Sequence, residues 1–396
     1  MATYTPVQLS ISTKSHGAAA PGLGFTPPVT PTIDDRAGSP NATLSPLADT
    51  CYGNEADGAV AVSSPPHFRD QLEYQLDEED RPITFGTGAW SVVYKAFASP
   101  RTSNATRPFT PPSSPSPAGR LVAVKSPGRR DARPVMYAEA LALTRASSTP
   151  GSERHIVPFH GYITDSSSIV MSAVPLTLSS YIEDKARIAQ QNFSIRTMHD
   201  PVLGMAQWHD LAKKLIESLS WLHSNAHIVH GDIKPHNILL RPRGSLDGDI
   251  DSAEFPYDPL FADFSSSYST TSSGTEIPSN ACLSAVTTPF TAPELLKALR
   301  SPDVIPEPAS DVFSLAVTLL GAATGDILVY SGLHPTLRLQ CAKDGHLIIE
   351  WARQCGTNGT RVPPNGLVEK LLKPAVAKVP AERITAHAWL DLASTI

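Results

Sequence analysis

A short segment of the chain holds three side chains that suit phosphoryl-transfer chemistry. Asp232, Lys234 and Asn237 lie within residues 230–240, immediately before an apolar run with the character of a β-strand. Transfer of a phosphoryl group to a hydroxyl needs a group that orients the nucleophile, a cation near the moving phosphoryl and a metal ligand. A carboxylate, an ammonium and a carboxamide at these short spacings can meet the three needs.

The bulk composition predicts one large domain with irregular extensions. The chain has 396 residues, a formal net charge of -6 and 37 prolines, more than helices and strands absorb. Such a length buries a sizeable core, and the charge gives no global signature of nucleic-acid or anionic-membrane binding. The most apolar window, residues 312–323, is too short for a membrane span and predicts a buried helix. Four scattered cysteines and the lack of a secretory signal predict reduced thiols and a cytoplasmic or nuclear location.

Composition divides the chain into a tail, an acidic lead-in and a globular domain. We expect residues 1–66, rich in Pro, Ser and Thr, to be disordered because they lack the apolar surface that offsets ordering entropy. Several Ser/Thr-Pro pairs in this tail are candidate targets of proline-directed kinases, although composition is the better explanation of any single pair. The lead-in covers residues 67–82, and the globular domain is predicted to start at Ile83 and to end near residue 394.

The globular domain is predicted to have a small strand-rich lobe followed by a large helical lobe. Residues 83–174 contain β-branched runs, a helical period over residues 136–143 and a Pro/Ser-rich insertion at residues 99–119. Residues 175–394 have mostly helical signals, for example at 211–222, with a polar insertion at about residues 243–257. This order predicts an α+β fold with two lobes.

Two glycines precede the first clear strand pair. Gly86 and Gly88 allow backbone N–H groups to approach phosphate oxygens without a Cβ in the way. A dinucleotide-binding fold uses a similar string, but a helix follows it there. Here the β-branched residues Val92 and Val93 continue as a strand, so the pattern favours a hairpin that covers a nucleotide.

Several segments, taken in order, resemble the motifs of eukaryotic-type protein kinases. Residues 230–237 resemble the catalytic loop H-R-D-x-x-x-x-N, with Gly231 in place of the arginine. Residues 122–125 resemble the V-A-I-K strand, residues 263–265 resemble D-F-G, and residues 292–294 match A-P-E. The resemblance covers residues 83 to about 394 and implies the protein-kinase fold. The Pro/Ser-rich tail and insertions are similar to those of fungal kinases.

The resemblance implies a role for each residue of the constellation. Asp232 would orient the substrate hydroxyl, and Lys234 would neutralise charge on the transferred group. Asn237 and Asp263 would bind Mg²⁺, or Mn²⁺ as a substitute, while Lys125 would position the phosphates of ATP. Further ATP contacts are implied for the Gly-rich loop, the roof over adenine, the gatekeeper and the hinge, namely Gly86, Gly88, Val93, Ala123, Met171 and Ala173.

Other matches imply supporting contacts. Lys125 would pair with Glu139, which lies on a predicted helix among apolar neighbours and needs a partner if it faces the core; a solvent-facing Glu139 is the alternative. Glu294 would pair with Arg383. The helix after residue 310 resembles the one whose aspartate, here Asp311, braces the catalytic loop.

The sequence therefore predicts a monomeric enzyme that transfers the γ-phosphoryl of Mg-ATP to Ser and Thr of protein substrates. Lys234 and Thr287 resemble the serine/threonine branch rather than the tyrosine branch. A pseudokinase that binds nucleotide as a scaffold is the first alternative, and a kinase of small molecules is the second. Because Gly231 supplies no guanidinium for a phosphorylated activation segment, we expect activity without phosphorylation of residues 266–288.

Overall fold

The computed structural model describes residues 64–101, 119–243, 254–270, 286–298, 305–356 and 358–396. These residues all belong to one compact unit, Asp57–Ile396. The tail predicted to be disordered and the insertion predicted at residues 99–119 lie almost wholly outside the described residues.

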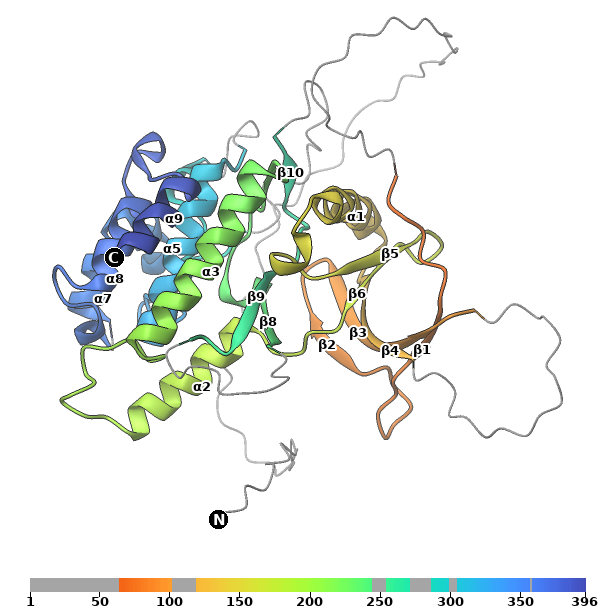
Figure 1. Ribbon diagram of the computed structural model, residues 1–396, viewed down its shortest axis with the longest axis horizontal. Coiled ribbons are helices and arrows are strands. Elements are labelled where there is room, and N and C mark those ends of the chain that lie inside the picture. Colours follow the sequence, from red (N-terminus) through yellow and green to blue (C-terminus); the bar gives the residue numbers. More distant parts are fainter. Residues whose placement is uncertain (1–63, 102–118, 244–253, 271–285, 299–304, 357) are drawn as a thin grey trace, which may run out of the picture. The chain divides into compact units, whose positions relative to one another are not determined.

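The first lobe is an antiparallel sheet with one long helix against it (Figure 1). The strand order is β1-β3-β4-β6-β5, and β2 also pairs with β3. The helix α1 (Arg133–Ser148) follows the short 3-10 turn η1 (Arg130–Ala132) and contacts β4, β5 and β6. The strands are β1 (Gln71–Tyr74), β2 (Thr84–Thr87), β3 (Ser91–Ser99), β4 (Arg120–Pro127), β5 (Phe159–Ile163) and β6 (Ser168–Ser172).

The two faces of this sheet are buried by different partners because side chains alternate along a strand. Val122 and Val124 of β4 belong to a small apolar cluster that includes Phe68, which lies before β1. The next residue on β4, Lys125, lies on the opposite face, and its cross-strand partner Ile169 belongs to the large core that includes α1. The sheet therefore presents Lys125 toward the side that α1 covers.

The second lobe is mostly helical. Its longest helix, α3, presents the predicted apolar face of residues 211–222, and α5 is buried along almost its whole length, as the apolar window predicted. No helix in the described ranges is long and apolar enough to cross a membrane. The helices are α2 (Leu178–Gln191), α3 (Met205–Ser224), α4 (Pro293–Lys297), α5 (Pro308–Thr324), α6 (Pro335–Lys343), α7 (Ile348–Cys355), α8 (Leu367–Leu372) and α9 (Ala386–Thr395).

Two short strand pairs carry the polar segments of the second lobe. The strand β7 (Ile228–Val229) pairs with β10 (Tyr268–Ser269), and β8 (Ile238–Pro242) pairs with β9 (Tyr257–Phe261). Residues 230–237 follow β7, and residues 262–267 connect β9 to β10. The order of elements confirms the predicted α+β fold, a β-rich lobe before a helical lobe.

Two predicted boundaries are wrong. The folded domain begins before Ile83, because Gln71–Tyr74 pairs with β3 and Phe68 is buried at 6% exposure. Exposed, largely polar side chains on β1 conceal this strand in the sequence. The insertion predicted at about residues 243–257 ends earlier, because Phe255 is fully buried and β9 starts at Tyr257. Residues 244–253 lie outside the described residues.

Candidate active site

Lys125 and Glu139 form the predicted ion pair in the interior. Lys125 Nζ donates to both carboxylate oxygens of Glu139 at 2.7 Å, and both side chains are almost fully buried. Glu139 shares a buried face of α1 with Met136, Ala140 and Leu143, which is why its carboxylate points at the sheet. The solvent-facing alternative for Glu139 is therefore wrong.

Asp263 joins this pair from the second lobe. Lys125 Nζ also donates to Asp263 Oδ1 at 2.6 Å, and the backbone N–H of Phe264 donates to Glu139 Oε1 at 3.2 Å. Asp263 adopts a left-handed backbone conformation, with φ of 63°, two residues after the end of β9. The segment 263–264 thus lies against both members of the ion pair.

Asp232 lies at the centre of a second polar group. Lys234 Nζ donates to Asp232 Oδ2 at 2.6 Å, and Asn237 Nδ2 donates to the same oxygen at 3.0 Å. The Thr287 hydroxyl contacts the other oxygen, Oδ1, at 3.4 Å and accepts from Lys234 Nζ at 3.2 Å. Asp232 and Asn237 are each only 7% exposed. Thr287 therefore contacts both charged side chains of the catalytic-loop segment.

The two polar groups are neighbours because the loops that carry them are bonded together. The backbone N–H of Ala262 donates to the carbonyl of Asn237 at 2.9 Å, which sets Asp263 beside Asn237. His230 is fully buried, and its Nε2 lies 3.1 Å from the carbonyl of Ala262. All six polar residues predicted for the chemistry thus belong to one region, Lys125, Glu139, Asp232, Lys234, Asn237 and Asp263.

The buried carboxylate of Asp311 braces the loop that holds Asp232. Its Oδ2 accepts from the His230 N–H at 2.7 Å, and its Oδ1 accepts from the Gly231 N–H at 2.9 Å. Asp311 lies in the first turn of α5 at 1% exposure, where it also contacts His223. This arrangement confirms the predicted brace, and it fixes the backbone on which Asp232 stands.

Gly231 is required by the local structure. Its φ is 78°, and an added Cβ would lie 2.5 Å from the carbonyl oxygen of Ser266. A side chain at this position is therefore disfavoured both by backbone conformation and by contact with main-chain atoms. Ser265 stands where the D-F-G motif has its glycine. Its φ is not positive, so the backbone at this position does not require glycine.

Gly86 and Gly88 have no such structural requirement. Neither has a positive φ, and an added Cβ at Gly86 would have no atom within 4 Å. At Gly88 the nearest atom would lie 3.7 Å away, an ordinary contact. Neither packing nor backbone conformation therefore requires glycine at these two positions.

The residues predicted to surround adenine lie on the same face of the sheet as Lys125. Val93 is the cross-strand partner of Lys125, and Ala123 lies two positions before it on β4. Met171 is the partner of Ala123, and directly opposed residues point to the same face. Ala173 follows β6 in the half-buried connection to α2. Their arrangement suits an apolar site next to the lysine.

Residues 116–392 match the sequence model of the protein kinase domain. The match contains both polar groups and the Asp311 brace, together with Glu294 and Arg383. The chain belongs to the protein kinase family. Gly86, Gly88 and Val93 lie before the matched residues, and they fall on the hairpin of β2 and β3 that pairs with the kinase domain's β4.

Three relatives carry kinase names. Serine/threonine-protein kinase ISR1 of Saccharomyces cerevisiae is 30% identical over 192 residues, which is 47% of this chain and 40% of that protein. The protein of the same name from Eremothecium gossypii is 26% identical over 136 residues, 33% of this chain and 38% of that protein. Mitogen-activated protein kinase kinase 3 of Arabidopsis thaliana is 27% identical over 282 residues, 69% of this chain and 44% of that protein. The chain thus spans less than half the length of each relative.

The kinase domain contains a second predicted ion pair, between Glu294 and Arg383. The guanidinium donates from Nη1 and Nη2 to the two carboxylate oxygens, both at 2.7 Å. The Arg383 side chain has no exposed surface and also donates to the carbonyls of Ala309 and Ala377. This pair joins the start of α4 to the segment before α9, and it confirms the predicted pairing.

The pKa values within the kinase domain follow from burial and from the two lysines. Burial raises the pKa of Asp232 to about 6, although Lys234 acts in the opposite direction. Burial alone would lower the pKa of Lys125, but Asp263 and Glu139 together raise it. Partial burial would raise the pKa of Asp263, and Lys125 holds it well below its usual range. Asp263 therefore stays a carboxylate at all physiological pH values.

Asn237 and Asp263 have the ligand chemistry that suits a magnesium ion. Mg²⁺ prefers hard oxygen ligands. Asn237 Nδ2 donates to the backbone carbonyl of Asp232 at 2.8 Å, an orientation that assigns the amide nitrogen to the loop and leaves the amide oxygen as its ligand atom. Asp263 binds Lys125 through Oδ1 and has a second carboxylate oxygen. The two residues fit a divalent cation held beside phosphates.

Some contacts of the kinase domain carried no signal in the sequence. The contact of Ser266 with Gly231 and the bond from Phe264 to Glu139 join residues far apart in the chain. His223, at the end of α3, contacts Asp311 at 3.0 Å without any motif around it. Such contacts depend on tertiary packing, so short-range spacing does not reveal them.

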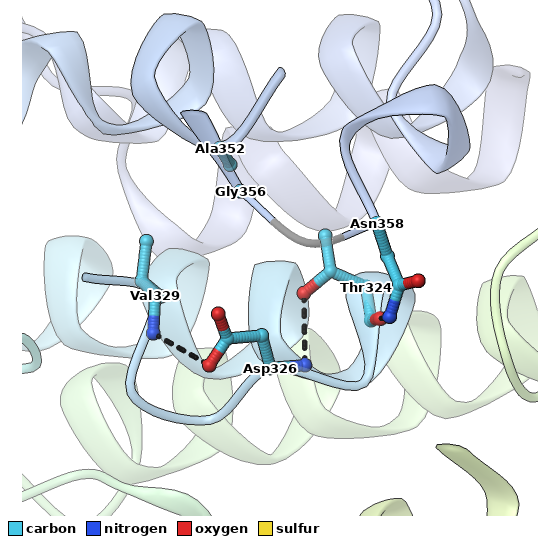
Figure 2. Close-up of a pocket in the computed structure, with 6 residues that line it drawn as sticks. All are labelled: Thr324, Asp326, Val329, Ala352, Gly356 and Asn358. Atoms are coloured by element: carbon cyan, nitrogen blue, oxygen red, sulfur yellow. Dashed lines mark hydrogen bonds between the residues drawn. The ribbon is translucent and has the colours of Figure 1, made fainter. Parts of the chain in front are cut away.

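A small pocket of the second lobe lies apart from these residues (Figure 2). It is lined by Thr324, Asp326, Val329, Ala352, Gly356 and Asn358. The Asp326 N–H donates to Thr324 Oγ1 at 3.2 Å, and the Val329 N–H donates to Asp326 Oδ1 at 3.2 Å. Its volume of about 10 Å³ suits no more than about one water molecule.

Proposed function

We propose that this protein is an active kinase that transfers the γ-phosphoryl of Mg-ATP to Ser and Thr hydroxyls of protein substrates. The observation that carries the proposal is the arrangement around Asp232, whose carboxylate is held by Lys234, Asn237 and Thr287. The names of the three relatives, all protein kinases, support the same class of activity.

The proposed reaction assigns Asp232 to the substrate hydroxyl. The carboxylate accepts the hydrogen bond of the hydroxyl and takes its proton as the new O–P bond forms. The bond between the γ-phosphorus and the β,γ-bridging oxygen breaks in the same step, and ADP leaves with that oxygen. Lys234 lies 2.6 Å from Asp232, and its charge would offset negative charge on the transferred group. Transfer of this kind relies on positioning and electrostatics, so loss of one group reduces the rate more than it reduces stability.

The nucleotide is assigned to the other polar group and to the Gly-rich hairpin. Lys125, fixed by Glu139, would bind phosphate oxygens, and the backbone at Gly86 and Gly88 would approach them closely. Asn237 and Asp263 would hold Mg²⁺, which supplies positive charge to the phosphate oxygens when bound. The apolar face formed by Val93, Ala123 and Met171 would accept the adenine ring.

The serine/threonine specificity rests on the contact between Lys234 and Thr287. Thr287 lies beside both Lys234 and Asp232, and this pair of residues resembles the serine/threonine branch of the family. Phosphoamino-acid analysis of a labelled substrate separates phosphoserine and phosphothreonine from phosphotyrosine. Label on tyrosine alone would overturn the assignment.

A transfer assay with γ-labelled ATP, Mg²⁺ and a generic basic protein tests the activity. We expect label on the substrate with the wild-type chain and none with Asp232→Asn, which keeps the size of the side chain but removes its negative charge. Asp165→Asn is the matched control, because Asp165 is exposed on the turn between β5 and β6. Transfer equal in wild type and Asp232→Asn would contradict the mechanism.

The same preparation separates the two alternatives. Binding of Mg-ATP without transfer by the wild-type chain would indicate a pseudokinase that acts as a scaffold. Transfer to a small-molecule hydroxyl with no transfer to any protein would indicate a kinase of small molecules. Chelation of the divalent cation with EDTA should abolish transfer, and Mn²⁺ should restore it.

We also propose that the start of the activation segment needs no phosphate to adopt its position. Two uncharged contacts hold this segment: Gly231 packs on Ser266, and the Thr270 N–H donates to the His227 carbonyl at 2.9 Å. With glycine at position 231, this loop position supplies no guanidinium for a phosphate. Replacement of every Ser and Thr between residues 266 and 285 by Ala should leave folding and transfer intact; a folded but inactive variant would contradict the proposal.

A further inference from the structure

The turn between β2 and β3 is attached to the segment that leads into α1. Trp90 stands at this turn, and the Arg129 guanidinium lies over its ring, with Cζ 4.0 Å from the ring centroid. Gly128 donates its N–H to the Trp90 carbonyl at 2.8 Å, so side chain and backbone both join the two segments. Trp90 and Arg129 are called the clasp below.

The clasp also connects the Gly-rich turn to the helix of Glu139. Arg129 Nε lies 2.9 Å from Asp131 Oδ1, and Asp131 belongs to η1, which leads directly into α1. Eight residues after Asp131, α1 carries Glu139, which binds Lys125. A continuous series of contacts therefore runs from the tip of the turn to the lysine.

The turn has little else to hold it in place. Gly88 donates to the Ser91 carbonyl at 2.7 Å within the turn itself, while the strand β2 is exposed at every residue. Glycine adds backbone freedom that has to be lost when the turn is ordered over a ligand. An anchor at the tip removes part of that cost before the ligand binds.

We infer that the clasp of Trp90 and Arg129 preorganises the Gly-rich turn for nucleotide, and that both are positioning residues for the phosphates. This inference rests on the proposed function of the same site. The clasp touches none of Asp232, Lys234, Asn237 or Asp263, so its loss should weaken nucleotide binding and leave the transfer step nearly unchanged.

Steady-state kinetics and equilibrium binding test the inference on the full-length chain. Trp90→Ala and Arg129→Ala should each raise the KM for ATP about 2- to 5-fold, the effect of an exposed cation–π contact, with kcat within about 2-fold of wild type. The Kd for the Mg²⁺ complex of a non-hydrolysable ATP analogue should rise by the same factor. Arg130→Ala is the matched control, because Arg130 is the adjacent exposed arginine.

Three further variants separate the clasp from other roles of the same residues. The Trp90 indole N–H is buried and has no hydrogen-bond partner among the described residues. Trp90→Phe removes that N–H but keeps an aromatic face, so it should rescue most of the loss seen in Trp90→Ala. Arg129→Lys should also rescue in part, because it keeps the cation. The double variant Trp90→Ala/Arg129→Ala should be no weaker than either single variant, because each removes the same contact.

Hydrogen exchange supplies a measurement that does not depend on activity. The Gly128 amide, which donates to Trp90, should exchange faster in Trp90→Ala and Arg129→Ala than in wild type and Arg130→Ala. The inference would be overturned if the alanine variants left the KM and the Kd unchanged or lowered the KM. It would also be overturned if the effects of the two single variants on KM added up in the double variant. Nucleotide binding by a wild type that transfers no phosphoryl would contradict the proposed function alone, since the Kd comparison still tests the clasp.

Discussion

In the proposed mechanism, Asp232 accepts a proton in a site that disfavours charge. It is nearly buried, and burial raises its pKa to about 6, while the ammonium of Lys234 acts against this rise. A carboxyl with this pKa is mostly ionised at pH 7, yet it takes a proton more readily than an exposed aspartate. The environment of Asp232 thus suits it to accept the hydroxyl proton.

This environment predicts an acidic limit to activity. Below pH 6 Asp232 becomes protonated and no longer accepts the proton of the hydroxyl, so kcat/KM should fall about tenfold per pH unit. Lys234→Met removes the charge that favours the carboxylate, so the fall in kcat/KM should begin at a higher pH, and the maximal rate should also drop. Measurement of kcat/KM across pH in buffers of constant ionic strength gives this acidic limb for the wild type and for the variant. The assignment of Asp232 would be contradicted by a wild-type acidic limb with its midpoint near pH 4. It would also be contradicted if the midpoint moved to lower pH in Lys234→Met.

Gly231 gives a second prediction at the scale of one residue. Gly231→Ala should lower the free energy of unfolding and the rate of transfer, because its Cβ would lie 2.5 Å from the Ser266 carbonyl oxygen. Gly332→Ala is a matched control, since Gly332 has φ of 86° but open space around the added Cβ. The control should cost about 1–2 kcal/mol for backbone strain.

Gly231→Ala should lower the free energy of unfolding by about 1–3 kcal/mol more than Gly332→Ala does, which is the range for overpacking. Urea unfolding of both variants gives the comparison, and equal losses would show that the Ser266 contact is not tight. Gly231→Arg should be at least as destabilised, so it should not gain activity when the activation segment is phosphorylated.

At the scale of elements, the pair of Glu294 and Arg383 predicts a large effect of a single substitution. Arg383→Ala leaves the Glu294 carboxylate partly buried without its partner and should cost about 3–5 kcal/mol. Arg187→Ala on α2 removes a pair whose side chains are more than 60% exposed and should cost about 0–1 kcal/mol. Urea unfolding compares the two variants. A similarly small loss of unfolding free energy in both variants would mean that α4 is held mainly by its apolar contacts.

The elements that the sequence reveals are those with strong local patterns. The apolar face of α3 and the buried length of α5 follow from periodicity, and the hairpin of β2 and β3 follows from β-branched residues after the glycines. The motif residues around Asp232 are recognisable in the sequence because their spacing is short. The structural reason for glycine at position 231 is not visible in the sequence, because Ser266 approaches it only in the folded chain.

The strand β1 shows the other limit of local patterns. Both β1 and β2 pair with β3, and between them the chain leaves the sheet in an exposed turn closed by the bridge of Leu76 and Pro82. The acidic residues of that turn resemble a linker in composition, although Asp77 is bonded to Arg81. A strand interrupted in this way has no continuous period for the sequence to display.

At the scale of the whole molecule, the segment before β1 completes the first lobe. The Phe68 N–H donates to the Tyr162 carbonyl on β5, and the Phe68 side chain packs with Val122, Val124 and Val170 on the outer face of the sheet. The same segment then continues into β1 at the opposite edge of the strand order. It therefore ties together strands that are not neighbours in the sheet.

This tie predicts that the N-terminal boundary decides the stability of the first lobe. Phe68→Ala should lower the free energy of unfolding in urea by about 3–5 kcal/mol, because it leaves a cavity in the outer apolar cluster. Phe97→Ala, on β3 with 37% exposure, is the matched control and should stay within about 1 kcal/mol of wild type. A chain shortened to begin at Ile83 loses Phe68 and β1 together, so it should be less stable than the Phe68→Ala variant. A chain shortened to begin at Ser64 keeps both and should unfold at the same urea concentration as the full chain; equal stability of the two shortened chains would show that the sheet does not depend on this segment.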